Sequence, residues 1–292
     1  MRRRLLCMML CFLLCAAAAA AEEPASFFEN AERDSVGRTV RTYDSPTLKY
    51  VQEKFHMEGE VCYLTRIWVS DPARQIRKAT SRWEKDVEYP EKIAKQIPEA
   101  VVAINGSGFV SPKYPEIPDN YPGESRDYHF TPLGSVTVTD GEVFRNLEGV
   151  SYYGLALDAD GLQMYVDADN AAVLATNPVQ TWSFYIECPM MRNNEDILPE
   201  NWPFADRRAA RTIIARIDRN DYLILTVTKE NRTGVSLRRA VEFFRENFDT
   251  EWVYNLDGGD STALMCRKKG AKKMKLAIRR YAKIVDIMAF TE

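Results

Sequence analysis

Histidine is nearly absent from this sequence: the chain of 292 residues contains two, His56 and His129. There is also no Cys-x-x-Cys pair, so the residues that usually hold a structural zinc ion are missing. The same scarcity argues against a phosphodiesterase that breaks a P–O bond with metals held by His and Asp clusters. We therefore expect no metal and no other cofactor.

Cysteine is scarce beyond the N-terminus. Three of the six cysteines lie in the first 15 residues, which leaves Cys62, Cys188 and Cys266. An odd number of cysteines cannot pair completely within one chain, and Cys62 and Cys266 lie in apolar, strand-like runs. We expect buried thiols and a fold held together by a hydrophobic core rather than by disulfides.

The sequence has no apolar run long enough for a confident membrane-spanning helix. Three arginines at residues 2–4 precede an apolar run at 5–15 and a small-residue site at 19–21, the pattern of a cleaved export signal. The alternative is an uncleaved N-terminal anchor. With cleavage after residue 21, we expect a secreted or extracytoplasmic protein without stable membrane insertion.

Basic residues are too few for a nucleic-acid-binding protein. Removal of residues 1–21 takes away three arginines and no acidic residue, which changes the net charge from −3 to −6. No basic stripe with interleaved aromatic residues occurs. The basic cluster at 267–280 is expected to be a solvated hairpin, with an anionic-polymer or membrane-surface patch as the alternative. We expect no nucleic-acid partner, and the oligomeric state stays open.

Internal repeats and Gly/Ser linkers are missing, so we expect a signal peptide at 1–21, a leader or stem at 22–45 and one domain at 46–292. Alternating apolar residues broken by turn residues predict four hairpins. Their strands are 50–56 with 61–70, 136–139 with 143–145, 155–157 with 162–166, and 212–217 with 222–228. Helices are expected at 91–97 and at 237–248, where Ser236 caps the start. The fold class is therefore α+β, with a large mixed, mostly antiparallel sheet and a few flanking helices.

Three segments join polar residues to apolar strands. Near the C-terminus, an apolar run at 252–256 leads into Asp257-Gly258-Gly259-Asp260-Ser261. Glycines after an acidic residue permit positive φ and bring amide donors close to an anion such as phosphate, although a tight turn is the simpler interpretation. Residues 101–109, which include Asn105 and Gly106, and residues 210–215, which begin Ala210-Arg211-Thr212, have the same design.

In this order, and with Gly234-Val235-Ser236-Leu237 between the last two, these segments resemble the motifs of the phosphodiester glycosidase family. The resemblance covers about residues 101–261. It implies the same α+β fold and hydrolysis of the glycosidic C–O bond of a sugar-1-phosphodiester or cell-surface glycan. Two residues depart from the family pattern, Ser107 and Asp260, each in place of a glycine. A carboxylate at Asp260 would repel a phosphate or raise the pKa of Asp257.

That chemistry assigns the candidate roles. Asp257 is the catalytic carboxylate, acting as nucleophile or as base for water at the anomeric carbon. Arg211 clamps the phosphate bidentately, and Asn105 hydrogen-bonds sugar hydroxyls or orients a water. The amides of the glycine loop and the Ser261 hydroxyl cradle phosphate oxygens. The full substrate-binding set is Gly106, Thr212, Asn255, Gly258, Gly259, Asp260 and Ser261.

Structural alternatives exist for each catalytic candidate. Arg211 could form a surface ion pair with Asp206 or Glu187, Asn105 could form a turn, and Ser261 could cap a helix. The proline-rich segment 110–132 follows the Asn105 strand and is either a plain loop or a substrate-covering lid. At the level of function, the alternative to an enzyme is a noncatalytic surface module that binds a phosphorylated glycan.

Overall fold

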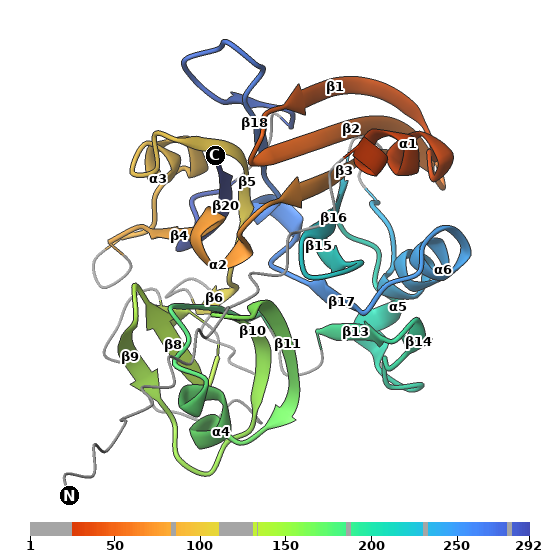
Figure 1. The fold of residues 1–292 in the computed structure, drawn as a ribbon. Helices are drawn as coiled ribbons and strands as arrows, with labels where there is room; N and C mark the ends of the chain where they lie inside the picture. Colours follow the sequence, from red (N-terminus) through yellow and green to blue (C-terminus); the bar gives the residue numbers. More distant parts are fainter. Residues whose placement is uncertain are drawn as a thin grey trace, which may run out of the picture.

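The computed structural model of the chain describes residues 25–82, 86–110, 131–132, 134–184, 188–229, 233–278 and 282–292. Strands dominate this part of the chain, and the strand pairs in it are antiparallel. This confirms the α+β class with mostly antiparallel strands. The strands divide among several sheets, where the sequence suggested one large mixed sheet (Figure 1).

The largest sheet in the described ranges has eight strands in the order β1-β2-β3-β16-β15-β17-β13-β14. Their bounds are β1 Arg38–Asp44, β2 Leu48–Met57, β3 Glu60–Val69, β13 Pro189–Arg192, β14 Glu195–Asp196, β15 Arg211–Arg216, β16 Asp221–Val227 and β17 Trp252–Asn255. The central strands β15 and β16 are buried along their whole length. Their middle residues are apolar on both faces because both faces of the sheet are covered at this point.

Two five-stranded sheets and one short ribbon complete the described strands. The sheet that carries Asn105 has the order β19-β18-β5-β20-β4, with β4 Ile76–Thr80, β5 Ala100–Asn105, β18 Leu264–Cys266, β19 Lys275–Leu276 and β20 Asp286–Thr291. The other has the order β11-β10-β12-β8-β9, with β8 Val136–Thr139, β9 Glu142–Asn146, β10 Tyr152–Asp158, β11 Gly161–Ala168 and β12 Gln180–Trp182. The ribbon pairs β6 Phe109–Val110 with β7 Thr131–Pro132.

The helices are short and lie around the sheets. They are α1 Ala25–Arg33, α2 Pro72–Gln75, α3 Pro90–Ala94, α4 Asn170–Ala175, α5 Pro203–Asp206, α6 Leu237–Asn247 and the 3₁₀ turn η1 Gly259–Ser261. In α6, the Ser236 side chain accepts a hydrogen bond from the Arg239 amide at 3.1 Å, as the sequence predicted. Its apolar face, with Ala240, Val241 and Phe244, is buried against the eight-stranded sheet.

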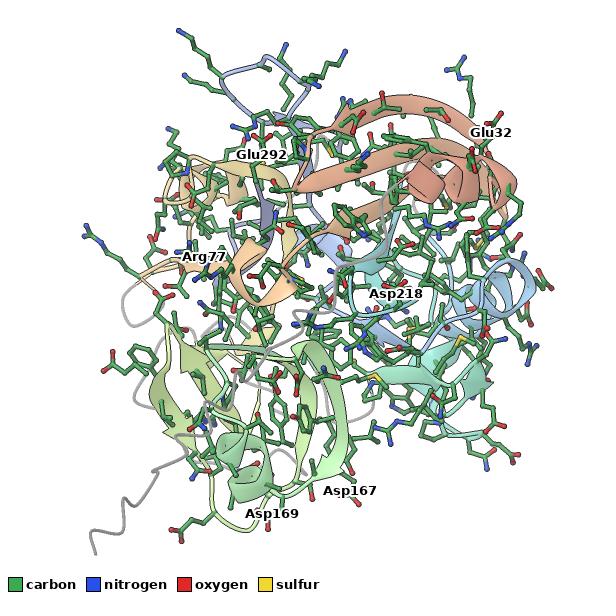
Figure 2. The ribbon with its side chains drawn as sticks, in the orientation of Figure 1. Glu32, Arg77, Asp167, Asp169, Asp218 and Glu292 are labelled. Atoms are coloured by element: carbon green, nitrogen blue, oxygen red, sulfur yellow. The ribbon has the colours of Figure 1, made fainter. Side chains whose placement is uncertain are left out.

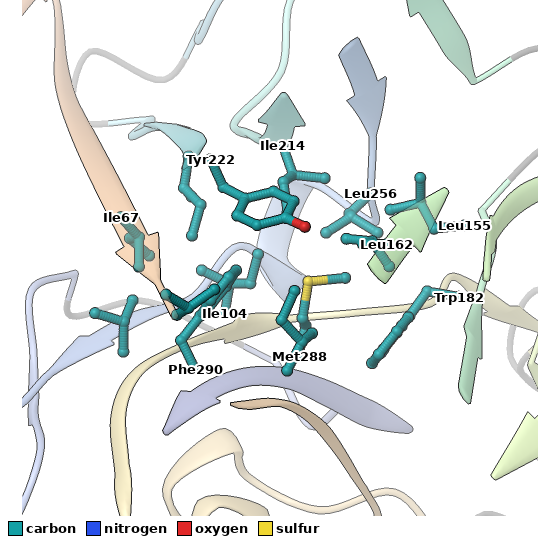
Figure 3. Packing of buried hydrophobic residues seen from close by; sticks show 14 of the residues in the cluster. Ile67, Ile104, Leu155, Leu162, Trp182, Ile214, Tyr222, Leu256, Met288 and Phe290 are labelled. Atoms are coloured by element: carbon teal, nitrogen blue, oxygen red, sulfur yellow. The ribbon is translucent and has the colours of Figure 1, made fainter. Parts of the chain in front are cut away.

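One hydrophobic core joins the sheets. Its side chains come from β15 (Ile214), β5 (Ile104), β20 (Met288), β10 (Leu155) and β12 (Trp182), and Figure 3 shows them converging. Cys62, Cys188 and Cys266 are buried and form no disulfide within the described residues, so packing holds that part of the chain together. No helix in that part is long and apolar enough to cross a membrane.

The four predicted hairpins are confirmed as β2–β3, β8–β9, β10–β11 and β15–β16, with the expected turns between them. The basic segment after β18 also forms a hairpin, β18–β19, and its tip is exposed at Lys268 and Lys269. Long charged side chains lie at the periphery, as Glu32, Arg77 and Asp169 do in Figure 2.

Residues 25–44 are not a loosely docked leader or stem. Phe27 and Ala31 of α1 are buried against Val51 and Trp68, and β1 is the edge strand of the eight-stranded sheet. The sequence pattern here is charged and irregular because α1 buries only a narrow face and β1 has one solvent-facing side. The predicted export signal at 1–21, residues 22–24 of the leader, His129 and the lid prediction for 111–130 lie outside the described residues.

Candidate active site

Asn105, the last residue of β5, connects the predicted motifs directly. Its Nδ2 donates to the Asp257 carbonyl oxygen at 2.7 Å. Its Oδ1 accepts from the Thr212 hydroxyl at 2.7 Å and from the Ala263 amide at 2.9 Å. Asn105 is fully buried, and its side chain joins three distant segments instead of forming a turn. Two sheets therefore meet at this side chain.

Asp257 lies in the loop that leaves β17. Its amide donates to the Gly106 carbonyl at 3.2 Å, and one carboxylate oxygen, Oδ1, accepts from the Gly258 amide at 2.8 Å. The side chain is 9% exposed, and burial raises its pKa to about 7, although hydrogen bonds from Ser261 and Gly258 act in the opposite direction. At neutral pH the carboxyl is thus divided between its protonated and ionised forms.

The glycine loop has the backbone geometry that its sequence predicts. Gly259 has φ +61°, in the left-handed region, and a side chain at Gly258 would place its Cβ 2.7 Å from the Ala210 carbonyl oxygen. The amides are already used, however: Gly258 donates to Asp257, and Gly259 donates to the Ala210 carbonyl at 2.8 Å. A phosphate would have to displace these bonds. Asp260 is exposed.

Arg211 begins β15, and its backbone lies next to the glycine loop. Side chains alternate along a strand, so the Arg211 side chain points away from that of Thr212. Its guanidinium donates to the carbonyl oxygens of Arg207 and Val235. The guanidinium carbon lies 5.1 Å from the centre of the Phe204 ring. Arg211 is 1% exposed, and burial lowers the pKa of its guanidinium to about 10.

The surface ion pair suggested for Arg211 does not include Asp206, which pairs with Arg238 at 3.0 Å. Glu187, the other suggested partner, lies outside the described residues. Within those residues no carboxylate pairs with the Arg211 guanidinium. A buried cation without an anion is costly.

Asn255 is buried at the end of β17. Its Nδ2 donates to the Cys188 sulfur at 3.6 Å, and its Oδ1 has no hydrogen-bond partner in the described part of the chain. Asn255 and Cys188 are both fully buried. The structure therefore places Asn255 in the protein interior, with its amide group directed at Cys188.

The sequence reasoning missed a second carboxylate. Asp286, the first residue of β20, has 1% of its side chain exposed, and its Oδ1 accepts from the Ser107 amide at 2.6 Å. Asp286 also closes off Gly106: a Cβ there would lie 2.1 Å from Asp286 Oδ1 and 2.7 Å from Trp182 Cδ1. An acidic residue inside the apolar run 284–290 was the available signal.

No group of three His, Cys, Asp or Glu side chains in the described residues is arranged to hold a metal ion. Because this holds only for the described residues, the absence of a metal stays a prediction. What the arrangement offers is a buried carboxyl with a raised pKa, the Ser261 hydroxyl hydrogen-bonded to that carboxyl, and the buried Arg211, whose backbone lies beside the glycine loop.

Fold and site together define an α+β protein in which the ends of strands from two antiparallel sheets meet around one aspartate. The model of the family described as phosphodiester glycosidase matches residues 98–285. The chain belongs to the phosphodiester glycosidase family. No curated protein matches the sequence.

Several solved structures match the chain, among them the following two. One is the catalytic domain of zebrafish N-acetylglucosamine-1-phosphodiester alpha-N-acetylglucosaminidase, auto-inhibited by pro-peptide, with a TM-score of 0.62, 16% identity, and 87% of each chain covered. The other is a hypothetical protein from Synechocystis, with a TM-score of 0.54, 14% identity, and 88% of this chain and 64% of that chain covered. At these identities the likeness extends to the fold.

Proposed function

We propose that this protein is an exported glycoside hydrolase that cleaves the glycosidic C–O bond of a sugar-1-phosphodiester. The observation that carries the proposal is the double link made by Asn105, which bonds to the Asp257 backbone and to Thr212 and so brings the three family motifs to one place. Export is inferred from the sequence of residues 1–21.

Asp257 is the reacting carboxylate in this proposal. Its ionised form attacks the anomeric carbon or takes a proton from an attacking water, while the phosphate leaves as a stable anion that needs no strong acid. A pKa of about 7 suits this role, because the base is then both strong and available near neutral pH.

The phosphate would be held by the groups around the glycine loop. Ser261 offers a hydroxyl next to Asp257, and a phosphate oxygen could replace Asp257 as acceptor for the Gly258 amide. Arg211 is the proposed positive charge: its backbone lies beside the loop, and its guanidinium faces Arg207, Val235 and Phe204. Because its donors reach backbone carbonyls, a bidentate clamp requires the guanidinium to change partners on binding.

Asn105 and Thr212 have a narrower role than direct substrate binding. Their side-chain bonds are already made within the protein, so they fix the Asp257 loop in position. Gly106 contributes by the absence of a side chain, which lets β20 approach.

The proposal is tested with Asp257→Asn and an N-acetylglucosamine-1-phosphodiester, the linkage in the name of the zebrafish relative. We expect a fall in turnover of about a hundredfold or more with the fold retained, because the amide can neither attack nor accept a proton. Asp249→Asn, an exposed acid after α6, is the matched control and keeps full turnover. Wild-type turnover in Asp257→Asn would remove the assignment.

Hydrolysis in oxygen-18 water identifies the bond that breaks. Label in the sugar corresponds to C–O cleavage, and label in the phosphate would identify a phosphodiesterase instead. Equilibrium binding of the same compound without release of sugar or phosphate would support the alternative, a noncatalytic surface module for phosphorylated glycans.

A further inference from the structure

An ion pair is buried beside the candidate active site. Lys78 Nζ of β4 lies 3.3 Å from Asp286 Oδ2 of β20, and both side chains are 1% exposed. Lys78 also donates to the Thr181 carbonyl at 2.7 Å and lies 5.8 Å from the centre of the Trp182 ring. Its neighbour Arg77 points to solvent (Figure 2). A buried ion pair is weak evidence for stability, because two apolar residues of similar size often serve as well.

The pair is connected to Asp257 through two residues of backbone. Asp286 Oδ1 accepts from the Ser107 amide at 2.6 Å, and the Asp286 carbonyl accepts from the Gly106 amide at 3.1 Å. The Gly106 carbonyl in turn accepts from the Asp257 amide at 3.2 Å. The charged pair thus holds the strand end on which the Asp257 loop rests.

We propose that the buried Lys78–Asp286 pair is a positioning device for Asp257: it anchors the Gly106–Ser107 backbone and sets the balance between the acid and base forms of Asp257. The inference rests on the proposed function, because it assigns the balance a catalytic purpose. Asp286 and Lys78 are positioning residues, since neither reaches the solvent from which a substrate would come.

The interactions that shift the pKa of Asp257 come from Ser261 of η1, the Gly258 amide and Asp286 of β20, and Lys78 of β4 pairs with Asp286. Burial has the largest effect on the pKa of Asp257, and the negative charge of Asp286 raises it further. Asp260, which the sequence suggested for this role, is exposed. Burial raises the pKa of Tyr152, whose hydroxyl donates to the Leu155 carbonyl, and the charge of Asp286 raises it further.

The test separates charge from anchoring with two variants of Asp286. Asp286→Asn keeps an acceptor for the Ser107 amide but removes the negative charge and leaves the Lys78 cation. We expect the Asp257 titration midpoint, followed by carbon-13 NMR of the carboxyl with Asp257→Asn as assignment standard, to fall by about half a unit to one unit. The limb of the pH–rate profile that reports the ionisation of Asp257 should move by the same amount. Turnover at the new optimum pH should be close to that of the wild type at its own optimum.

Asp286→Ala removes the acceptor as well, so we expect turnover to fall about tenfold or more in addition to the shift. If Asp286→Asn does not fold because Lys78 is left unpaired, the double variant Asp286→Asn with Lys78→Met removes both charges. The double variant should still shift the midpoint downward, because the charge of Asp286 raises the pKa of Asp257 and Lys78 is not among the groups that shift it. Arg77→Met, on the solvent side of β4, is the control and leaves the midpoint unchanged.

An unchanged Asp257 midpoint in folded Asp286→Asn and in the double variant would overturn the inference. The NMR titration needs no substrate, so this failure is distinct from that of the proposed function. If the wild type cleaves no sugar-1-phosphodiester but the Asp257 midpoint moves as expected, the electrostatic effect of Asp286 on Asp257 is confirmed and its role in catalysis is contradicted.

Discussion

At the scale of single residues, Asp257 should make stability depend on pH. Its pKa is raised to about 7 in the folded protein from 3.8, so the native state holds the proton more tightly than the unfolded state. The free energy of unfolding therefore falls as pH rises from about 4 to about 7 and is level on either side of that window. At ~1.4 kcal/mol per pH unit, the upper bound is about 4 kcal/mol.

Asp257→Asn removes this dependence because the amide does not titrate. As pH rises from 4.5 to 7.5, the free energy of unfolding of the variant should increase by about 2–4 kcal/mol relative to that of the wild type. Urea unfolding at each pH measures this difference. Asp249→Asn provides the baseline for an exposed acid. Parallel stability curves for Asp257→Asn and wild type would show that the Asp257 pKa is not raised.

Gly106 should be the least replaceable residue of the Asn105 segment. In Gly106→Ala the new methyl would lie 2.1 Å from Asp286 Oδ1 and 2.7 Å from Trp182, and both neighbours are buried. We expect a loss of about 2–4 kcal/mol of stability, measured by thermal unfolding. Gly141→Ala is the control, because its Cβ meets no atom within 4 Å and only its φ of +77° is unfavourable, at about 1 kcal/mol.

At the scale of elements, α6 should depend on its N-cap. The Ser236 hydroxyl accepts from the Arg239 amide, and α6 supports the face of the sheet where Ile213 and Val253 are buried. Ser236→Ala should lower the free energy of unfolding by about 1 kcal/mol, whereas Ser236→Asp keeps an acceptor and should lose little. Equal losses in the two variants would contradict a capping role.

The elements show what the sequence could and could not predict. The four hairpins were predictable because each is local: alternating residues flank a turn, and Gly59 and Gly141 adopt the positive φ that such turns need. Helix α6 was predictable from its cap and its 3.6-residue period. The distribution of strands among sheets was not, because it is set by pairing between strands far apart in the sequence.

The same distinction applies to the site. Asn105 and Asp257 were found because family motifs mark them, and they do meet. Asp286 and Lys78 were missed because only the order β5-β20-β4 brings them to Gly106, and nothing local in the sequence specifies that order. The direction of the Arg211 side chain was accessible in principle: if Thr212 faces Asn105, alternation turns Arg211 to the other face.

At the scale of the whole molecule, residues 25–44 act as part of the fold. Asp34 pairs with Arg66 at 2.7 Å, and Arg66 in turn holds Asp221 at 2.7 Å. The amides of Val36 and Gly37 donate to the buried Glu53 carboxylate at 2.9 and 2.8 Å. Removing this segment would expose one edge of the eight-stranded sheet and leave Glu53 without these donors.

A chain that begins at residue 45 should therefore be less stable than one that begins at residue 22, by about 3–6 kcal/mol or about 10 °C in Tm, measured by scanning calorimetry. Phe27→Ala, which removes one buried ring of α1, should account for about 2–4 kcal/mol of this. The matched control is Glu32→Ala on the exposed side of α1 (Figure 2), which should change Tm by less than about 2 °C. If the shorter chain unfolds at the same temperature as the longer one, the segment is a dispensable stem after all, and the packing of Phe27 and Ala31 against Val51 and Trp68 contributes nothing to stability.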